Sequence, residues 1–99
     1  MFVTKCRAEF LGHQIVARNS WGLTFSLKGM TGENRLYIDG ELVDNNTEMV
    51  ALASTPIMRG RIVDQQNNAH VVEVYARSGL IRVMLRIHID GKKVAGEDF

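Results

Sequence analysis

Basic side chains follow one face of the segment 82–88 of this 99-residue chain. Arg82, Arg86 and His88 all fall on even positions, and Arg77 precedes them. Every second residue of a β-strand points to the same side. Arginines in such a row bind phosphate groups or, beside an aromatic ring, single-stranded nucleic acid. The candidate ligand-binding residues are therefore Arg77, Arg82, Arg86 and His88. The alternative is a solvent-exposed face on which these arginines pair with Glu73.

The three histidines and the single cysteine are the candidates for metal binding or nucleophilic catalysis. A metal site needs ligands that converge on one point, and the spacing of His13, His70 and His88 matches no metal motif. Cys6 would act as a nucleophile only beside a base such as histidine. Because Phe10 shares its face, we expect Cys6 to be a small buried side chain. Whether His13, His70 and Cys6 meet depends on the fold.

Acidic side chains gather near one predicted hairpin, at Asp39, Glu41, Asp44 and Glu48. A calcium loop alternates its oxygen ligands more closely and carries a glycine at a set place, and this segment has neither feature. No two carboxylates stand out as an acid–base pair, and the chain has no glycine-rich phosphate loop. We therefore expect no metal, no cofactor and no catalytic residue, and favour a non-enzymatic protein, with an enzyme as the third class of function.

The composition indicates a folded domain with nearly balanced charge. Hydrophobic residues make up 45% of the chain, and 12 Lys and Arg face 11 Asp and Glu. These values are typical of a globular protein, and the length predicts one domain over residues 1–99. The net charge of +1 disfavours a dedicated nucleic-acid binder. One cysteine forms no internal disulfide, and no segment reaches the ~20 apolar residues of a membrane span. We expect a cytoplasmic protein outside the membrane.

Alternation of apolar and polar residues with a period of two dominates the chain. Such a pattern predicts strands that each place one face in the core. We therefore predict an all-β fold, an antiparallel β-sandwich or a barrel-like variant, with about seven or eight strands. The predicted strands include 5–10, 13–18, 21–27, 70–77 and 81–89, and the predicted turns include 28–34 and 64–69.

The stretches LYIDGELV and IHIDGKKV read as two hairpins of the same design. Asp-Gly suits a two-residue turn in which both residues have positive φ, so we place turns at 39–40 and 90–91. The alternation on either side of each turn then places Val43 and Val94 on the core face. What the two stretches share is the turn and the apolar pattern, which indicates a folding element rather than an acidic site.

The similarity between the two halves extends upstream of these hairpins. HQIVARNSWGL, 13–23, aligns without gaps on HVVEVYARSGL, 70–80. We hypothesise an internal duplication with candidate repeats 13–44 and 70–96, each a three-stranded meander. The two copies would pack face to face, because one small sheet alone buries only one side.

Two segments of the sequence each fit two interpretations. NTEMVALAS, 46–54, fits either a short helix capped by Thr47 or a strand, and Pro56 ends it in both cases. MRGRI, 58–62, carries two arginines around Gly60. It fits either a basic binding segment or an edge strand kept soluble by its charges.

The order of the motifs GHQIVARNSW, LYIDGELVDNN, MRGRI, HVVEVYA and IRVMLRIHIDGKKV resembles that of small uncharacterised bacterial all-β proteins with repeated DGELV-type hairpins. The paired hairpins are more remotely similar to the β-sandwich of Fas apoptosis inhibitory molecule. Both resemblances imply a fold built of short strands. Neither of them implies catalytic residues.

We predict a small non-catalytic binding or interaction module. It would form a homodimer or bind a protein partner through an edge strand or an apolar outer patch such as Val16, Leu42 and Met49. The alternative is a phosphate- or single-stranded nucleic-acid-binding protein that uses the basic strand face described above.

Overall fold

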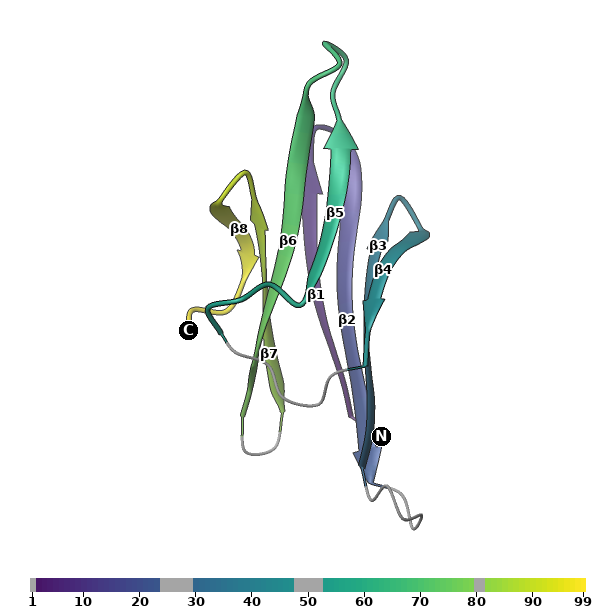
Figure 1. Ribbon diagram of the computed structural model, residues 1–99, viewed down its shortest axis with the longest axis vertical. Helices are drawn as coiled ribbons and strands as arrows, with labels where there is room; N and C mark the ends of the chain where they lie inside the picture. The colour runs from purple at the N-terminus through teal and green to yellow at the C-terminus, as the bar shows by residue number, and fades with distance from the viewer. Residues whose placement is uncertain (1, 24–29, 48–52, 80–81) are drawn as a thin grey trace.

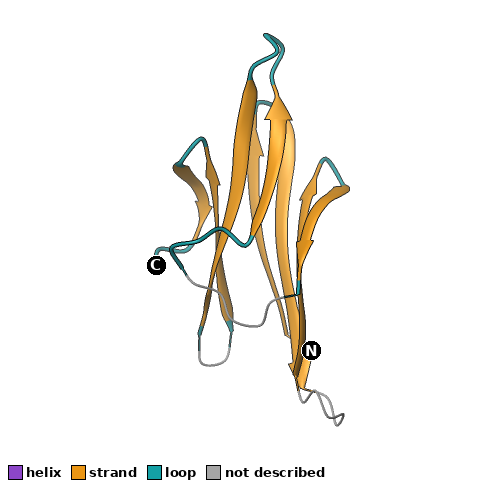
Figure 2. Ribbon diagram, in the orientation of Figure 1, coloured by secondary structure: helices purple, strands orange, loops and turns teal. Residues whose placement is uncertain are grey.

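The computed structural model describes residues 2–23, 30–47, 53–79 and 82–99. Within these ranges the chain forms strands and turns and no helix (Figure 2). No helix of the described part is therefore long and apolar enough to cross a membrane. The strands are β1 (Phe2–Phe10), β2 (His13–Leu23), β3 (Met30–Ile38), β4 (Glu41–Asn46), β5 (Met58–Val63), β6 (Ala69–Ser78), β7 (Val83–Ile89) and β8 (Lys92–Gly96).

The strands form two four-stranded antiparallel sheets, which we call sheet A (β1-β2-β3-β4) and sheet B (β5-β6-β7-β8). In each sheet every strand pairs with its neighbour in sequence, as hairpins require. The sheets face each other, with β1 against β7 and β8 and with β3 and β4 against β5 (Figure 1). The predicted all-β, sandwich-like fold and its strand number are confirmed.

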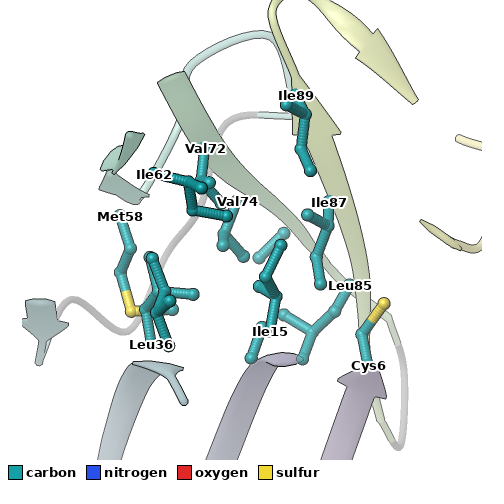
Figure 3. Packing of buried hydrophobic residues seen from close by; sticks show 13 residues of the cluster. Cys6, Ile15, Leu36, Met58, Ile62, Val72, Val74, Leu85, Ile87 and Ile89 are labelled. Atoms are coloured by element: carbon teal, nitrogen blue, oxygen red, sulfur yellow. The ribbon is translucent and has the colours of Figure 1, made fainter. Parts of the chain in front are cut away.

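The core lies between the two sheets and consists of the inward side chains of alternate residues (Figure 3). In β6, Val72, Val74 and Ala76 are buried as predicted, and Cys6 in β1 is buried as well. Aliphatic side chains from both sheets interdigitate, and burying each one fully stabilises the fold by roughly 1.5–3 kcal/mol. The largest fully buried side chains are those of Ile15, Leu36, Met58, Leu85, Ile87, Val72 and Val74.

The predicted Asp-Gly turns are confirmed by their backbone. Asp39 has φ +52° and Gly40 φ +82°, and the second turn repeats these values at Asp90 and Gly91, +51° and +80°. Aspartate tolerates positive φ better than most residues, and glycine adopts it freely. Each turn therefore closes its hairpin with little strain.

The register beyond these turns differs from the prediction at one residue in each hairpin. A β-bulge shifts the pairing, so that Leu36 faces Asp44 and Ile87 faces Ala95. Val94 is 43% exposed, so its predicted core position is wrong. Val43 is 44% exposed, although its side chain lies on the predicted side and faces Gly60 of β5. A bulge places two residues opposite one and interrupts the alternation. The period of two can therefore no longer be followed past it.

Two predicted strands, 13–18 and 21–27, belong in their described part to one long strand, β2. Strand β3 also begins at Met30, inside the predicted turn 28–34. The polar pair Asn19 and Ser20 resembles a break in the sequence, but both residues are buried within the sheet. Asn19 Nδ2 donates to Asn34 Oδ1 across the strands at 2.7 Å, and this bond lets the polar pair stay inside a strand.

Gly60 has a packing role in the centre of β5. A Cβ atom there would lie 3.0 Å from Ile38 Cδ1 and 3.2 Å from Val43 Cγ2, so the bare backbone lets β5 lie closely over sheet A. Arg59 and Arg61 point away from this contact and are exposed. Part of the ambiguous segment 46–54 lies outside the described residues, as do positions 24–27 and 81 of the predicted strands.

The two sheets share their strand order, their turn type and the position of their bulge. Each unit has four strands rather than the three predicted, because β1 pairs along β2 and β5 pairs along β6. The candidate repeats 13–44 and 70–96 leave out these first strands. The internal duplication itself stays a prediction.

Candidate functional site

Strand β7 places two of the predicted ligand-binding residues, Arg86 and His88, on the outer face of sheet B. Arg77 lies on the same face in β6 and is exposed, whereas Arg82 precedes β7. Strand β7 therefore places two residues of the predicted row on one face. Their availability to a ligand depends on the contacts that these side chains already make within the protein.

Arg86 is held by groups of the protein itself. Its guanidinium lies over two rings, 4.8 Å from the centroid of Tyr75 and 4.3 Å from that of Phe99. It also donates to the backbone oxygens of Phe99 and of Ala53, the latter at 3.1 Å. Its buried Nε atom has no hydrogen-bond partner among the residues that the structure describes. Arg86 thus fastens the C-terminal residues and the segment before β5 to the outer face of sheet B.

Two further charged residues near this face, Arg82 and Glu73, form ion pairs. Arg82 forms an ion pair with Glu97 at 2.7 Å, which raises the pKa of Arg82. The rings of His88 and Tyr75 are 4.7 Å apart, and burial together with the nearby Arg86 lowers the pKa of His88. The expected partner of the arginines, Glu73, pairs with Arg59 at 3.5 Å. Among the four predicted residues, only Arg82 forms an ion pair in the described part of the chain, and Arg77 is exposed.

The outer face of sheet A carries a row of three basic residues. Lys5, Arg18 and Arg35 are direct cross-strand neighbours in β1, β2 and β3. Their side chains point outward, because a core residue stands next to each of them in its strand. Like charges directly opposite each other destabilise a sheet. The row therefore concentrates positive charge at a cost to the fold.

A second row lies one pleat further along the same strands. It contains Arg7, Val16, Tyr37 and Leu42, again as direct cross-strand neighbours. The predicted apolar patch is thus present in part, since Tyr37 lies between Val16 and Leu42, whereas Met49 is outside the described residues. We call the two rows together the basic face: Lys5, Arg7, Val16, Arg18, Arg35, Tyr37 and Leu42.

The cations of the basic face differ in their partners. Arg35 makes two hydrogen bonds to Glu33, at 2.7 and 3.1 Å, and its Nη1 lies 3.4 Å from the Tyr37 hydroxyl. These bonds raise the pKa of Arg35 and lower that of Glu33. Lys5, Arg7 and Arg18 form no ion pair with any residue that the structure describes. Lys5 and Arg7 are therefore free to meet an anionic partner, whereas Arg18 also acts on Glu33 and helps to lower the pKa of that carboxyl.

Sequence reasoning missed this face because its charges come from three strands. The alternation assigns Lys5 and Arg7 to the polar side of the predicted strand 5–10, and Arg18 to that of the predicted strand 13–18. The alternation tells which side each strand shows, but not which residues become neighbours. The usable signal was the joint occurrence of basic outward positions in consecutive strands of one meander.

The histidines His13 and His70 lie at equivalent positions, each bound to the aspartate of a turn. His13 Nδ1 is 2.6 Å from Asp39 Oδ2, and His70 Nδ1 is 2.7 Å from Asp90 Oδ2. His70 also contacts Asp64, with Nε2 2.9 Å from Oδ2. The hydrogen bonds from His70 lower the pKa of Asp64 and of Asp90, and both carboxylates raise the pKa of His70.

These histidines lie at the same end of the molecule, away from Cys6. Phe10 is the cross-strand neighbour of His13, and its ring meets that of His70 edge-on with centroids 5.1 Å apart. Cys6 precedes Phe10 by four residues of an extended strand, about 13 Å. The three residues therefore do not converge. Burial raises the pKa of the Cys6 thiol, which disfavours the nucleophilic thiolate.

The histidine end carries an open cleft beside His70. The cleft has a volume of about 400 Å³, and both nitrogens of the adjacent His70 already face carboxylates. In the described residues no group of three or more His, Cys, Asp or Glu is placed to hold a metal ion. The side chains that line the cleft are Leu11, His13, Val63, Asp64, Gln65 and Gln66.

Comparison with known proteins adds no family to this description. No family model, curated protein or solved structure matches the chain. The resemblances drawn from the motifs therefore stay predictions, and the functional argument rests on the residues themselves.

Proposed function

We propose that the protein is a non-catalytic binding module that holds an anionic partner on the basic face of sheet A. The observation that carries this proposal is the row of Lys5, Arg18 and Arg35, three cations placed side by side across three strands. Such a row weakens the free protein. A bound anionic partner would attract each of these cations and offset the repulsion between them.

The charge of this face favours an anionic partner over a second copy of the chain. In a symmetric dimer the same patch of each subunit meets itself. Lys5, Arg7 and Arg18, which have no ion pair in the described residues, would then face the cations of the same patch on the second copy, and like charges at short distance repel. The basic face, with Val16, Tyr37 and Leu42 at its centre, therefore suits a partner of opposite charge better than a second copy of the chain.

Two charge-matched variants test the proposal, with inorganic polyphosphate as the probe. One combines Lys5→Gln with Arg18→Gln on the basic face. The other combines Arg61→Gln with Arg77→Gln on the outer face of sheet B, where both arginines are exposed. Each variant loses two positive charges, so bulk charge is the same. We expect the first to reduce affinity by roughly tenfold or more and the second to change it little.

The proposal would be overturned if both variants lost the same affinity for polyphosphate, or if only the Arg61 and Arg77 variant lost affinity. The second outcome would move the site to sheet B, where Arg77 was predicted to bind. Thermal unfolding serves as the folding control. Because Lys5 and Arg18 repel each other as direct neighbours, their double variant should be at least as stable as the wild type.

A further inference from the structure

We propose that the ligand of the basic face is a single-stranded nucleic acid. This inference rests on the proposed function and names the class of its partner. It follows from the way in which the face combines free cations with an aromatic and aliphatic centre. Each of these two features accounts for a different part of the ligand.

The cations match a regularly charged chain. Neighbouring strands lie about 4.8 Å apart, and residues two positions apart on a strand lie about 6.7 Å apart. Lys5 and Arg18 therefore stand one strand spacing apart, and Arg7 stands one pleat from Lys5 on β1. A flexible backbone with a phosphate at every nucleotide can place successive charges on such a grid. An isolated phosphate would reach only part of it.

The centre of the face matches exposed bases. Tyr37 stands between Val16 and Leu42, and its hydroxyl faces Arg35 Nη1, which holds the ring in place. An aromatic ring flanked by aliphatic side chains offers a surface on which a base can stack. A duplex hides its base faces inside the helix and would bring only sugar and phosphate to this centre. An acidic protein would satisfy the cations but would not need the ring.

The binding test compares four probes with the complete chain. The probes are fluorescein-labelled dT12, the RNA oligomer rU12, a 12-base-pair duplex and polyphosphate. We expect dT12 and rU12 to bind more tightly than the duplex and polyphosphate at the same salt concentration. The logarithm of the affinity should fall with the logarithm of the salt concentration. The slope should be about −2 for three phosphate contacts, and Lys5→Gln should make it shallower by about 0.7.

Variants of Tyr37 separate stacking from charge. Tyr37→Leu should weaken dT12 binding about tenfold, the usual effect of one lost stacked base, and should leave polyphosphate binding unchanged. Tyr37→Phe keeps the ring and should retain dT12 binding. The matched control is Tyr75→Leu on the outer face of sheet B, which should not affect dT12 binding even though it removes a contact of Arg86.

Photocrosslinking of the wild-type protein makes the test independent of how the variants fold. A dT12 probe that carries 5-iodouracil should crosslink to Tyr37, and peptide mass spectrometry locates the bond. Crosslinking at Tyr75 instead would overturn the inference. So would equal affinity for dT12 and polyphosphate, or tighter binding of the duplex. Equal affinity or tighter duplex binding would leave an anionic partner on the basic face in place. Crosslinking at Tyr75, or failure to bind any of the probes, would overturn the proposed function as well.

Discussion

The imidazole Nδ1 of His70 lies 2.7 Å from Oδ2 of Asp90, the residue that opens the β7–β8 turn. The other carboxylate oxygen of Asp90 accepts the backbone N–H of Val71 at 3.0 Å, and Asp90 N–H donates to Val71 O. Asp90 thus adopts the positive φ of the turn and ties that turn to β6. His13 and Asp39 repeat the arrangement in sheet A.

We expect the stability contributed by His70 to depend on pH with a definite sign. Its pKa is raised in the folded protein by Asp64 and Asp90. Its contribution is therefore complete below the unfolded value of about 6.5 and is lost as pH rises through the folded value. His70→Gln should lower the urea midpoint more at pH 5.5 than at pH 9. An equal effect at both pH values would contradict this.

His88→Gln supplies a control of opposite sign. The pKa of His88 is lowered, first by burial, so the folded protein binds its proton less readily than the unfolded chain. The contribution of His88 is present above the unfolded pKa and is lost as pH falls. The urea midpoint of the wild type should therefore exceed that of His88→Gln by more at pH 9 than at pH 5.5. The opposite order would contradict this.

The bulges predict unequal effects for two aliphatic residues of the second hairpin. Ile87→Ala removes a side chain that is fully buried between the sheets and should lower the free energy of unfolding by roughly 2–5 kcal/mol. Val94→Ala alters a side chain that the bulge leaves exposed and should cost less than about 0.5 kcal/mol. Urea unfolding measures both. If Val94→Ala lowered the free energy of unfolding as much as Ile87→Ala does, the register without a bulge would be supported.

Gly60→Val tests the close approach of β5 to sheet A. A Cβ at this position already lies 3.0 Å from Ile38 Cδ1, so a branched side chain forces the sheets to move. Overpacking of this kind typically costs about 1–3 kcal/mol. Arg61→Val places the same side chain on the outward face of the same strand and should change stability by about 0.5 kcal/mol or less. Equal thermal shifts for the two variants would show that the sheets lie further apart.

The buried amide pair Asn19 and Asn34 predicts coupling in a double-mutant cycle. Asn19→Leu removes the donor to Asn34 Oδ1 and leaves a buried polar group unpaired, at a cost of about 1–3 kcal/mol. Asn34→Leu should have a similar effect. Because the double variant leaves neither amide unpaired, its cost should be smaller than the sum of the two. Additive costs, measured by chemical unfolding, would show that the two amides act independently.

The sequence by itself determined local properties. The alternation around Val72 and Val74 identified the buried side of β6, because successive side chains of a strand point to opposite faces. The Asp-Gly pairs at 39–40 and 90–91 specified their turns, because few residues adopt positive φ. Both signals lie within a few neighbouring residues, so they could be recognised before the fold was known.

Only the tertiary structure decided which residues from different strands meet. The residues around Val94 do not by themselves predict the bulge, because the bulge depends on how β8 pairs with β7. Asn19 stays inside β2 because Asn34 lies across from it and accepts its hydrogen bond. The same holds for the basic face, since Lys5, Arg18 and Arg35 become neighbours through the pairing of β1, β2 and β3. Strand register depends on the energy of the whole sheet, and it joined these scattered cations into one surface.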